Sequence, residues 1–259
     1  VDRDLVRLLQ NRIKKHFESI LLETQVTTLN NNGSGVSVTL KNKTGTEQRV
    51  FDQVLISVGR SPNTNELGLE NTKVKINDKG FIVVDSQQKT NDSFISAIGD
   101  VTGDPMLAHK ASHEAKVAVE VIAGKSTNFD NRVIPAIVFT DPEIAWAGLT
   151  ETQAQTDGKK ISVAKFPWGA SGRAQSLGRG EGLTKLIIEP KTEKILGVGL
   201  AGTGAGELIS EGVLAIEMGI KAKDLSLMIH PHPTLSETLM EAAEVFYGTA
   251  THIYKKKRT

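Results

Sequence analysis

The sequence of 259 residues contains no cysteine. Structural disulfides, thiolate metal sites and thiol catalysis on this chain are therefore excluded. An excess of one charge is also missing, because 31 lysines and arginines nearly cancel 30 aspartates and glutamates. This balance argues against a nucleic-acid binder, which normally carries a basic excess on one face. The short basic run at residues 255–258 is expected to be a solvated tail.

Long apolar runs are missing as well. No stretch approaches the ~18 apolar residues that suggest a membrane-spanning helix, and no signal or transit pattern opens the chain. We therefore expect a cytoplasmic protein without membrane contacts. The chain instead opens on Leu5, Leu9, Ile13 and Phe17, whose four-residue spacing predicts an amphipathic helix over residues 1–17. Since no methionine precedes this helix, we expect further sequence upstream.

Residues 1–62 have the pattern of the later part of an α/β domain. The turn signal NNGSG predicts a hairpin between strands at 20–29 and 36–40, and VFDQVLISVG at 50–59 predicts another strand. In residues 63–130, KGFIVVD predicts a short strand pair and FISAIGD a buried strand. A helix is expected over 107–123, with Gly124 as its C-terminal stop.

From residue 131 the pattern changes to strands separated by short turns. IPAIVF, IAWAGL, ISVAKF, TKLIIEP and KILGVGLAG predict an antiparallel sheet. Helices are expected to follow at about 205–218, 223–229 and 235–247. This order, strands first and helices after them, is typical of an α+β arrangement.

Two short motifs invite a functional interpretation that their context does not favour. GVGLAG, from Gly197 to Gly202, matches a dinucleotide fingerprint, but its strand is expected to pair as a hairpin through EPKTEK, and the acidic residue expected about 20 positions later is missing. We expect close packing of a helix on the sheet there. His109 and His113 have the i, i+4 spacing of metal ligands, but the glutamate of the zinc-protease motif is not between them. No metal site is expected.

Asp100 is a candidate binding residue. It ends the apolar segment FISAIGD, which places a carboxylate at the edge of a sheet where α/β proteins bind ligands. Gly99 would let a ligand approach the backbone, and the carboxylate could accept hydrogen bonds from two hydroxyls of a sugar-like group. An aspartate in an ordinary strand-end turn explains the pattern equally well.

The segment HPHPTLSE, residues 230–237, supports two interpretations. Thr234 and Glu237 have the spacing of a capping box at a helix start. Glu237 could instead orient the imidazole of His232, and Pro233 permits a cis bond after that histidine. A carboxylate favours the charged ring and a helix N-terminus disfavours it, so His232 would exchange protons near neutral pH, as a general acid–base requires.

These segments occur together, in one order, in the dihydrolipoamide dehydrogenases. The chain strongly resembles the C-terminal half of that family of flavin-dependent pyridine nucleotide-disulfide oxidoreductases. The matching stretches span nearly the whole chain: VLISVGRSPNT, TNDSFISAIGDVTGDPMLAHKASHE, IPAIVFTDPEIAWAGLTE, FPWGASGRAQS and HPHPTLSETLMEAAEVFYG. MLAHKASHE and FPWGASGRA favour this family over glutathione and mercuric reductases. The resemblance implies oxidation of dihydrolipoamide to lipoamide, with electrons passing through a disulfide and FAD to NAD⁺.

The resemblance also implies a domain organisation. The expected fold class is an α/β remnant of nucleotide-binding domains followed by an α+β dimerisation domain with an antiparallel sheet. Residues 1–62 would be the C-terminal part of the NAD-binding domain and residues 63–130 the C-terminal part of the FAD-binding and central domains. Residues 131–259 would be the interface domain of a homodimer. The implied partner is the dihydrolipoyl group of 2-oxo acid dehydrogenase complexes.

The residues that match the family's motifs take on its roles. His232 resembles the catalytic acid–base and Glu237 its orienting partner, a pair that in the family reaches across the dimer interface to the other subunit's redox site. Asp100 resembles the ligand of the flavin ribityl chain, and Gly59 and Val26 resemble edges of the NAD pocket. Four consecutive residues would lie against the flavin: Met106, Leu107, Ala108 and His109.

One departure from the family is severe. The redox cysteine pair and both dinucleotide fingerprints of the family lie upstream of anything that matches here. We therefore expect either a fragment or a chain whose N-terminal half is missing. Two alternatives stay open beside the dehydrogenase: an inactive dimerisation and partner-docking module, and a related reductase with another disulfide substrate.

Overall fold

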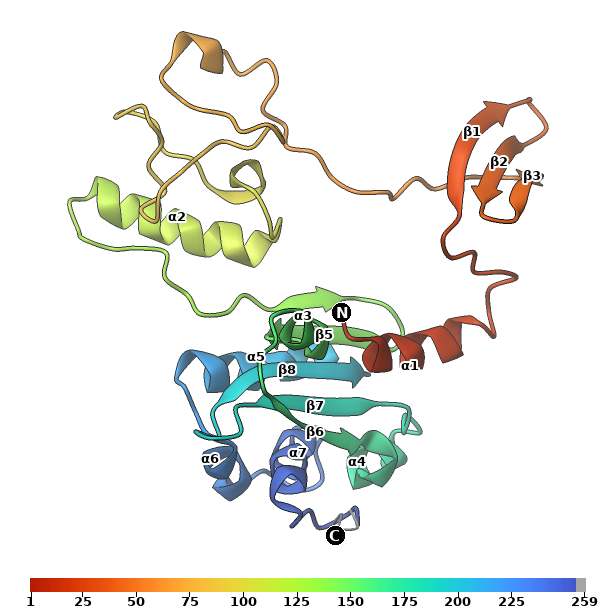
Figure 1. Ribbon diagram of the computed structural model, residues 1–259, viewed down its shortest axis with the longest axis vertical. Coiled ribbons are helices and arrows are strands. Elements are labelled where there is room, and N and C mark those ends of the chain that lie inside the picture. The colour runs from red at the N-terminus through yellow and green to blue at the C-terminus, as the bar shows by residue number, and fades with distance from the viewer. Residues whose placement is uncertain (255–259) are drawn as a thin grey trace.

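The fold is shown in Figure 1 as a computed structural model that describes residues 1–254. The predicted basic tail at residues 255–258 lies outside the described residues. No helix between residues 1 and 254 combines the length and the apolar character that a membrane span requires. In chain order the elements of the first half are α1 (Arg3–Ile13), β1 (Gln25–Asn31), β2 (Val36–Asn42), β3 (Gly45–Phe51), η1 (Leu69–Asn71), η2 (Gly99–Thr102) and α2 (Ala108–Ile122).

The second half contains the larger sheet and most of the helices. Its elements are β4 (Ala136–Val138), β5 (Glu143–Gly148), α3 (Glu151–Thr156), β6 (Ser162–Pro167), η3 (Trp168–Ala170), α4 (Gly172–Ser176), β7 (Leu183–Ile188), β8 (Ile195–Gly202), α5 (Ala205–Glu217), α6 (Ala222–Leu227) and α7 (Glu237–Tyr247). The five strands form one antiparallel sheet in the order β4-β5-β8-β7-β6. The predicted α+β arrangement of this half is confirmed.

Both faces of this sheet are covered, which explains its alternating apolar residues. On one face Ala145, Leu186 and Leu200 join residues of α5 and α7 in the main core. On the other face α1 packs on β5 and β8, and Leu5 is buried against Ile144. Neighbouring strand residues point to opposite faces, so each strand contributes to both cores.

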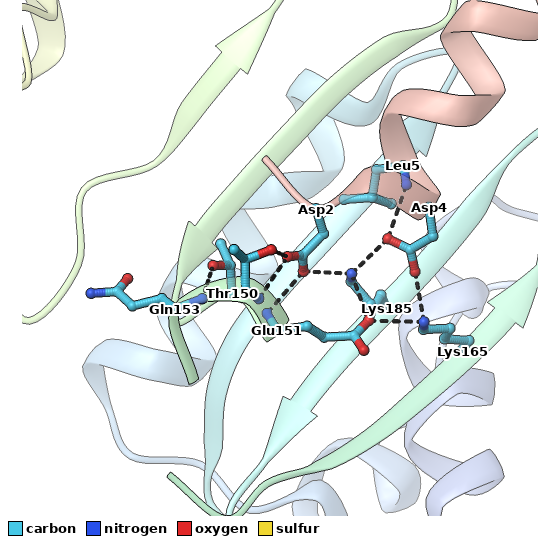
Figure 2. A network of polar contacts seen from close by, with 9 residues as sticks. Asp2, Asp4, Leu5, Thr150, Glu151, Gln153, Lys165 and Lys185 are labelled. Atoms are coloured by element: carbon cyan, nitrogen blue, oxygen red, sulfur yellow. Dashed lines mark hydrogen bonds and ion pairs between the residues drawn. The ribbon is translucent and has the colours of Figure 1, made fainter. Parts of the chain in front are cut away.

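A buried network of charges holds α1 on the sheet (Figure 2). The Nζ of Lys185, on β7, lies 2.5 Å from Asp2 Oδ2, 2.8 Å from Asp4 Oδ1 and 2.9 Å from Glu151 Oε1. Asp2 also accepts hydrogen bonds from the backbone N–H groups of Glu151 and Thr152 at the start of α3. The local cap of α3 is Thr150, whose hydroxyl accepts a hydrogen bond from the Gln153 N–H, and Asp2 adds to it from a distance of nearly 150 residues.

The first sheet contains only β1, β2 and β3, in antiparallel order. In Figure 1 it lies apart from the larger sheet, joined through an extended segment to the loops around α2. The hairpin predicted from NNGSG is confirmed. The strand predicted over residues 50–59 is wrong: β3 ends at Phe51, and the residues after it find no strand to pair with in the described chain, so Leu55 and Val58 are exposed.

The region before α2 consists mainly of loops. The buried strand predicted at FISAIGD is wrong, because only one isolated bridge, Lys89 to Ser96, pairs it and Phe94 is 96% exposed. The segment ends instead in the short helix η2, and the strand pair predicted from KGFIVVD is reduced to one bridge. The helix predicted over 107–123 is confirmed as α2, with Gly124 at φ +84° after its end. Helix α1 is shorter than predicted.

The glycine motif at residues 197–202 lies inside β8, which pairs with β7 through the predicted hairpin. A Cβ at Gly197 would come within 1.9 Å of the Leu149 carbonyl oxygen, and one at Gly202 would collide with the ring of Trp168. The predicted close packing of a helix on the sheet occurs at Gly199, where a Cβ would lie 2.7 Å from Leu5 Cδ1 of α1.

Candidate acid–base site

The segment between α6 and α7 carries the two histidines of the HPHP motif. It lies on the face of the sheet covered by α7, which contacts β6 and β7. The peptide bond between His232 and Pro233 is cis. Helix α7 begins at Glu237, so the carboxylate of that residue stands at the first turn, directly after the loop that presents His232.

His232 and Glu237 form a hydrogen-bonded pair. The Nδ1 of His232 lies 2.9 Å from Glu237 Oε1, and the other carboxylate oxygen accepts a 2.7 Å hydrogen bond from the Thr234 N–H. Burial raises the pKa of Glu237, but the Thr234 and His232 hydrogen bonds outweigh it and bring that pKa below its ordinary value. Glu237 is therefore a carboxylate at neutral pH.

The ionised carboxylate decides which ring nitrogen of His232 carries the proton. A carboxylate can only accept a hydrogen bond, so Nδ1–H must donate to Glu237. Nε2 of the neutral ring is then a free base, and it has no hydrogen-bond partner among the described residues. The His232 side chain is 69% exposed whereas that of Glu237 is 18% exposed. The half-buried Glu237 therefore holds the ring in place, and Nε2 of His232 is the basic nitrogen that faces outward.

The predicted capping box is only half formed. The Glu237 carboxylate does accept the Thr234 N–H, as such a box requires. The Thr234 hydroxyl, however, donates to the Pro231 carbonyl oxygen and does not bond a backbone N–H of α7. Because the loop turns before the helix begins, the carboxylate is shared between a backbone amide and the imidazole. The two interpretations of this segment thus describe one arrangement.

The other histidine of the motif plays a different part. His230 Nε2 lies 2.8 Å from Glu211 Oε1 on α5, and its side chain is buried. The Glu211 hydrogen bond outweighs burial and raises the pKa of His230. His230 therefore ties the loop to α5, while His232 faces outward.

Asp100 lies in η2, where its carboxylate pairs with the guanidinium of Arg60. Arg60 also donates to the Met106 carbonyl oxygen at 2.8 Å, so the segment after β3 is joined to residues 100–106, which follow 40 or more positions later. Gly99 donates its N–H to Glu114 Oε2 at 2.7 Å, and Glu114 forms a buried ion pair with Lys110. These contacts fix the backbone on which Asp100 stands.

The predicted residues at 106–109 lead from η2 into α2. Met106 and Leu107 are partly buried, whereas Ala108 and His109 are exposed at the helix start. His109 Nε2 lies 2.8 Å from the Pro135 carbonyl oxygen, while the ring of His113 packs edge-on against Phe129. The two histidines thus have separate partners.

The remaining two predicted residues lie elsewhere. Val26 is half exposed on β1, and Gly59 lies in the extended segment after β3 with φ +147°. A Cβ at Gly59 would meet no atom within 4 Å. Gly59 is linked to Asp100 only through its neighbour Arg60, whereas Val26 pairs with Leu40 of β2 and is not joined to the groups around Asp100 or His232 in the described structure.

Sequence reasoning missed several residues that support these groups. Arg60 directly follows the predicted residue Gly59 in the SVGR motif, so the motif could have drawn attention to it. Its contact with Asp100, 40 positions later, has no signal in the sequence. Lys110 and Glu114 have the i, i+4 spacing of a helical ion pair. Glu241, one turn after Glu237, pairs with His252, and nothing in the local sequence around His252 indicates this contact.

Comparisons with known proteins agree with the architecture. Residues 1–115 match the family model described as pyridine nucleotide-disulphide oxidoreductase, and residues 134–243 match that of the pyridine nucleotide-disulphide oxidoreductase dimerisation domain. The chain is 47% identical over 261 residues to a dihydrolipoyl dehydrogenase of Buchnera aphidicola subsp. Schizaphis graminum, covering 100% of this chain and 55% of the relative. It is 46% identical to the dihydrolipoyl dehydrogenase of Vibrio parahaemolyticus, covering 99% and 54%.

Solved structures show the same fold. The crystal structure of LpdA from Mycobacterium tuberculosis matches with a TM-score of 0.87 and 25% identity, over 95% of this chain and 53% of that one. The HOCl-induced flavoprotein disulfide reductase RclA from Escherichia coli matches with a TM-score of 0.84 and 29% identity, over 92% and 54%. The chain spans about half the length of the curated relatives it matches.

Proposed function

The chain belongs to the pyridine nucleotide-disulphide oxidoreductase family, and from this membership we propose that it is the acid–base and dimerisation part of a dihydrolipoyl dehydrogenase. The observation that carries the proposal is the 2.9 Å contact between His232 Nδ1 and Glu237 Oε1, which leaves Nε2 free to act. The division into residues 1–62, 63–130 and 131–259 remains part of this proposal.

His232 is proposed to take the proton of a dihydrolipoyl thiol. The S–H bond breaks, the proton moves to Nε2, and the sulfur keeps the electron pair as a thiolate. A free thiol has a pKa near ~8.5, so a base beside it increases the thiolate fraction at neutral pH. Glu237 holds the ring in the tautomer that accepts at Nε2 and stabilises the imidazolium that forms.

The residues around Asp100 fit a flavin. Its carboxylate is held by Arg60 on one oxygen, and the other remains available to accept hydroxyl hydrogen bonds. We propose that Asp100 and the segment from Met106 to His109 would hold FAD, and that Gly59 and Val26 border an NAD site. When bound, such a flavin supplies electron transfer between a dithiol and a nicotinamide. With no cysteine in this sequence, the disulfide of that chemistry is not on these 259 residues.

The test is His232→Gln in the full-length protein, assayed for oxidation of dihydrolipoamide. Turnover should fall by about 10²-fold or more, as loss of a general base typically causes. His16→Gln is the matched control, because His16 is exposed on the loop after α1, and its turnover should be unchanged. Turnover of the His232 variant within tenfold of the unmodified protein would remove the acid–base role.

A second candidate is a dimerisation and docking module without its own turnover. The match of residues 134–243 to a dimerisation domain and the absence of cysteine favour it for the chain as given. Sedimentation distinguishes the two: a stable colourless dimer without activity supports the module, and a yellow sample that oxidises dihydrolipoamide supports the enzyme. In the enzyme, the homodimer and the 2-oxo acid dehydrogenase complexes are the proposed partners.

A further inference from the structure

A second histidine–glutamate pair lies beside the first. Glu241 stands on α7 one turn after Glu237, and its Oε1 lies 2.5 Å from Nδ1 of His252 in the segment that follows the helix. The Glu241 side chain is 2% exposed and that of His252 is 49% exposed. A buried carboxylate with a half-exposed histidine repeats the arrangement of Glu237 with His232.

The two pairs line the same small cavity. Its walls include His232, Glu237, Glu241 and His252, and its volume is about 10 Å³. A cavity of this size has room for about one water molecule. Gly172 forms another wall, and a Cβ there would stand 4.0 Å from Cε1 of His232. All four ionisable groups therefore share one enclosed space.

Glu241 has a buried oxygen that nothing in the described chain satisfies. Its Oε2 has no hydrogen-bond partner among residues 1–254, and the same is true of Oε2 of Glu244. Burial, together with the nearby charge of Glu241, raises the pKa of Glu244. A buried charged oxygen without a partner is costly, so the Glu241 carboxylate depends on His252, which contacts its other oxygen, to offset its charge.

We propose that His252 is a positioning residue that offsets the charge of the buried Glu241 beside His232, so that Glu237, and not Glu241, sets the pH range over which His232 exchanges its proton. This inference rests on the proposed acid–base role of His232. While the second pair is ionised on both sides, its net charge is zero. Its influence on His232 is then small, and the Glu237 carboxylate dominates the field at the ring.

The charge of His252 also reaches the first pair. It lowers the pKa of Glu237, together with the hydrogen bonds that already outweigh burial. The other charged groups near the loop are His230, which is paired with Glu211, Arg173, the one charged residue of α4, and Glu244 of α7, whose pKa is raised by burial and by the charge of Glu241. In the described chain none of them forms an ion pair with Glu241 or His252. A substitution at Glu241 or His252 therefore changes the charge beside the first pair without removing a partner from these other groups.

The test is the titration of the His232 ring, followed by NMR in full-length protein with ¹³C-labelled histidine. In His252→Gln the Glu241 carboxylate loses its cation, and the surroundings of His232 become more negative. Because a more negative environment favours the protonated ring, the midpoint of the His232 titration should rise by about 0.5 to 1 pH unit. The pH profile of turnover should move the same way.

Two further variants separate charge from structural damage. The double variant Glu241→Gln with His252→Gln removes both charges and should return the midpoint to within about 0.3 unit of the unmodified protein, because the net charge is again zero. Glu241→Gln alone should lower the midpoint at pH values where His252 is protonated. His16→Gln should leave it unchanged.

An unchanged midpoint in His252→Gln overturns the inference, and so does a double variant that shifts as far as the single one. If His252→Gln does not fold, the shift in Glu241→Gln decides in its place. The titration is read without turnover, so it is independent of the proposed function. If His232→Gln loses turnover but the His232 midpoint does not move in the His252 and Glu241 variants, only this inference is removed. Full turnover in His232→Gln removes the proposed function itself.

Discussion

Replacing Lys185 by methionine should destabilise the fold far more than a change at any surface lysine. The Lys185 ammonium is 1% exposed and is surrounded by the carboxylates of Asp2, Asp4 and Glu151 (Figure 2). Burial lowers the pKa of Lys185, but the three carboxylates outweigh burial and raise it. Methionine has a similar volume and no charge, so the buried Asp2 carboxylate and the partly exposed Asp4 and Glu151 carboxylates would lose their main cation.

The magnitude follows from the structure. The network lowers the pKa of Asp2 from 3.8 to about 2, although burial alone raises it. A pKa lowered by about two corresponds to roughly 2–3 kcal/mol for this one group. Removing one partner of a buried ion pair costs about 3–5 kcal/mol. We therefore expect Lys185→Met to lower the free energy of unfolding by about 3–5 kcal/mol.

The assay is urea unfolding followed by tryptophan fluorescence, because both tryptophans, Trp146 and Trp168, lie in the larger sheet and its adjoining turn. Lys165→Met is the matched control. Lys165 contacts Asp4 and Glu151 at 2.7 and 2.8 Å but is 39% exposed, so its loss should cost about 1 kcal/mol or less.

A charge-compensated variant completes the comparison. Asp2→Asn combined with Lys185→Met leaves one fewer buried carboxylate, so it should recover part of the lost stability. Equal losses for Lys185→Met and Lys165→Met, or a loss below 1 kcal/mol for the former, would refute the reasoning that burial makes this network strong.

Acid should remove the contribution of Asp2: its folded pKa of about 2 lies below its ordinary value of 3.8, so its stabilisation is complete above about pH 5 and is mostly lost by pH 2. Between those pH values the free energy of unfolding should drop by about 2 kcal/mol more in the unmodified protein than in Asp2→Asn, and equal drops would contradict this. Gly197→Ala should cost about 3 kcal/mol or more, or prevent folding, because its Cβ would lie 1.9 Å from the Leu149 carbonyl oxygen. Gly169→Ala, with its nearest neighbour Gly180 O at 3.9 Å, should cost under about 1 kcal/mol, and similar thermal midpoints for the two variants would count against the packing argument.

Local pattern predicted the strands and the last three helices of the second half, because each of these carries its own signal, but it did not predict the short helices α3, η3 and α4. The turn EPKTEK, the alternating strands and the apolar stripes of α5 and α7 agree with one another, and they recover the hairpin of β7 and β8. The apolar segments at 50–59 and 94–100 carry the same strand signal. They remain extended or looped, because a strand also needs a neighbour to receive its hydrogen bonds, and periodicity does not report whether one is present.

The candidate site was predictable only where its residues are close in sequence. His232 and Glu237 are five residues apart, and their contact is as expected. The pairs of Arg60 with Asp100 and of Glu241 with His252 join residues 40 and 11 positions apart. No periodicity connects such residues, since the backbone path between them decides whether they meet.

The docking of α1 has a consequence for the order of synthesis. Asp2 and Lys185 are 183 positions apart, and Leu5 packs on strands that end at residue 202. A ribosome adding about 5–20 residues per second needs roughly 10–40 s to make that length. During this interval the apolar stripe of α1 has no native partner, because the helix is made well before the strands on which it packs. Among the described elements, the one that precedes all the others in the sequence can therefore dock only after β8 is complete, and delay or mispairing during those seconds leaves its apolar stripe exposed.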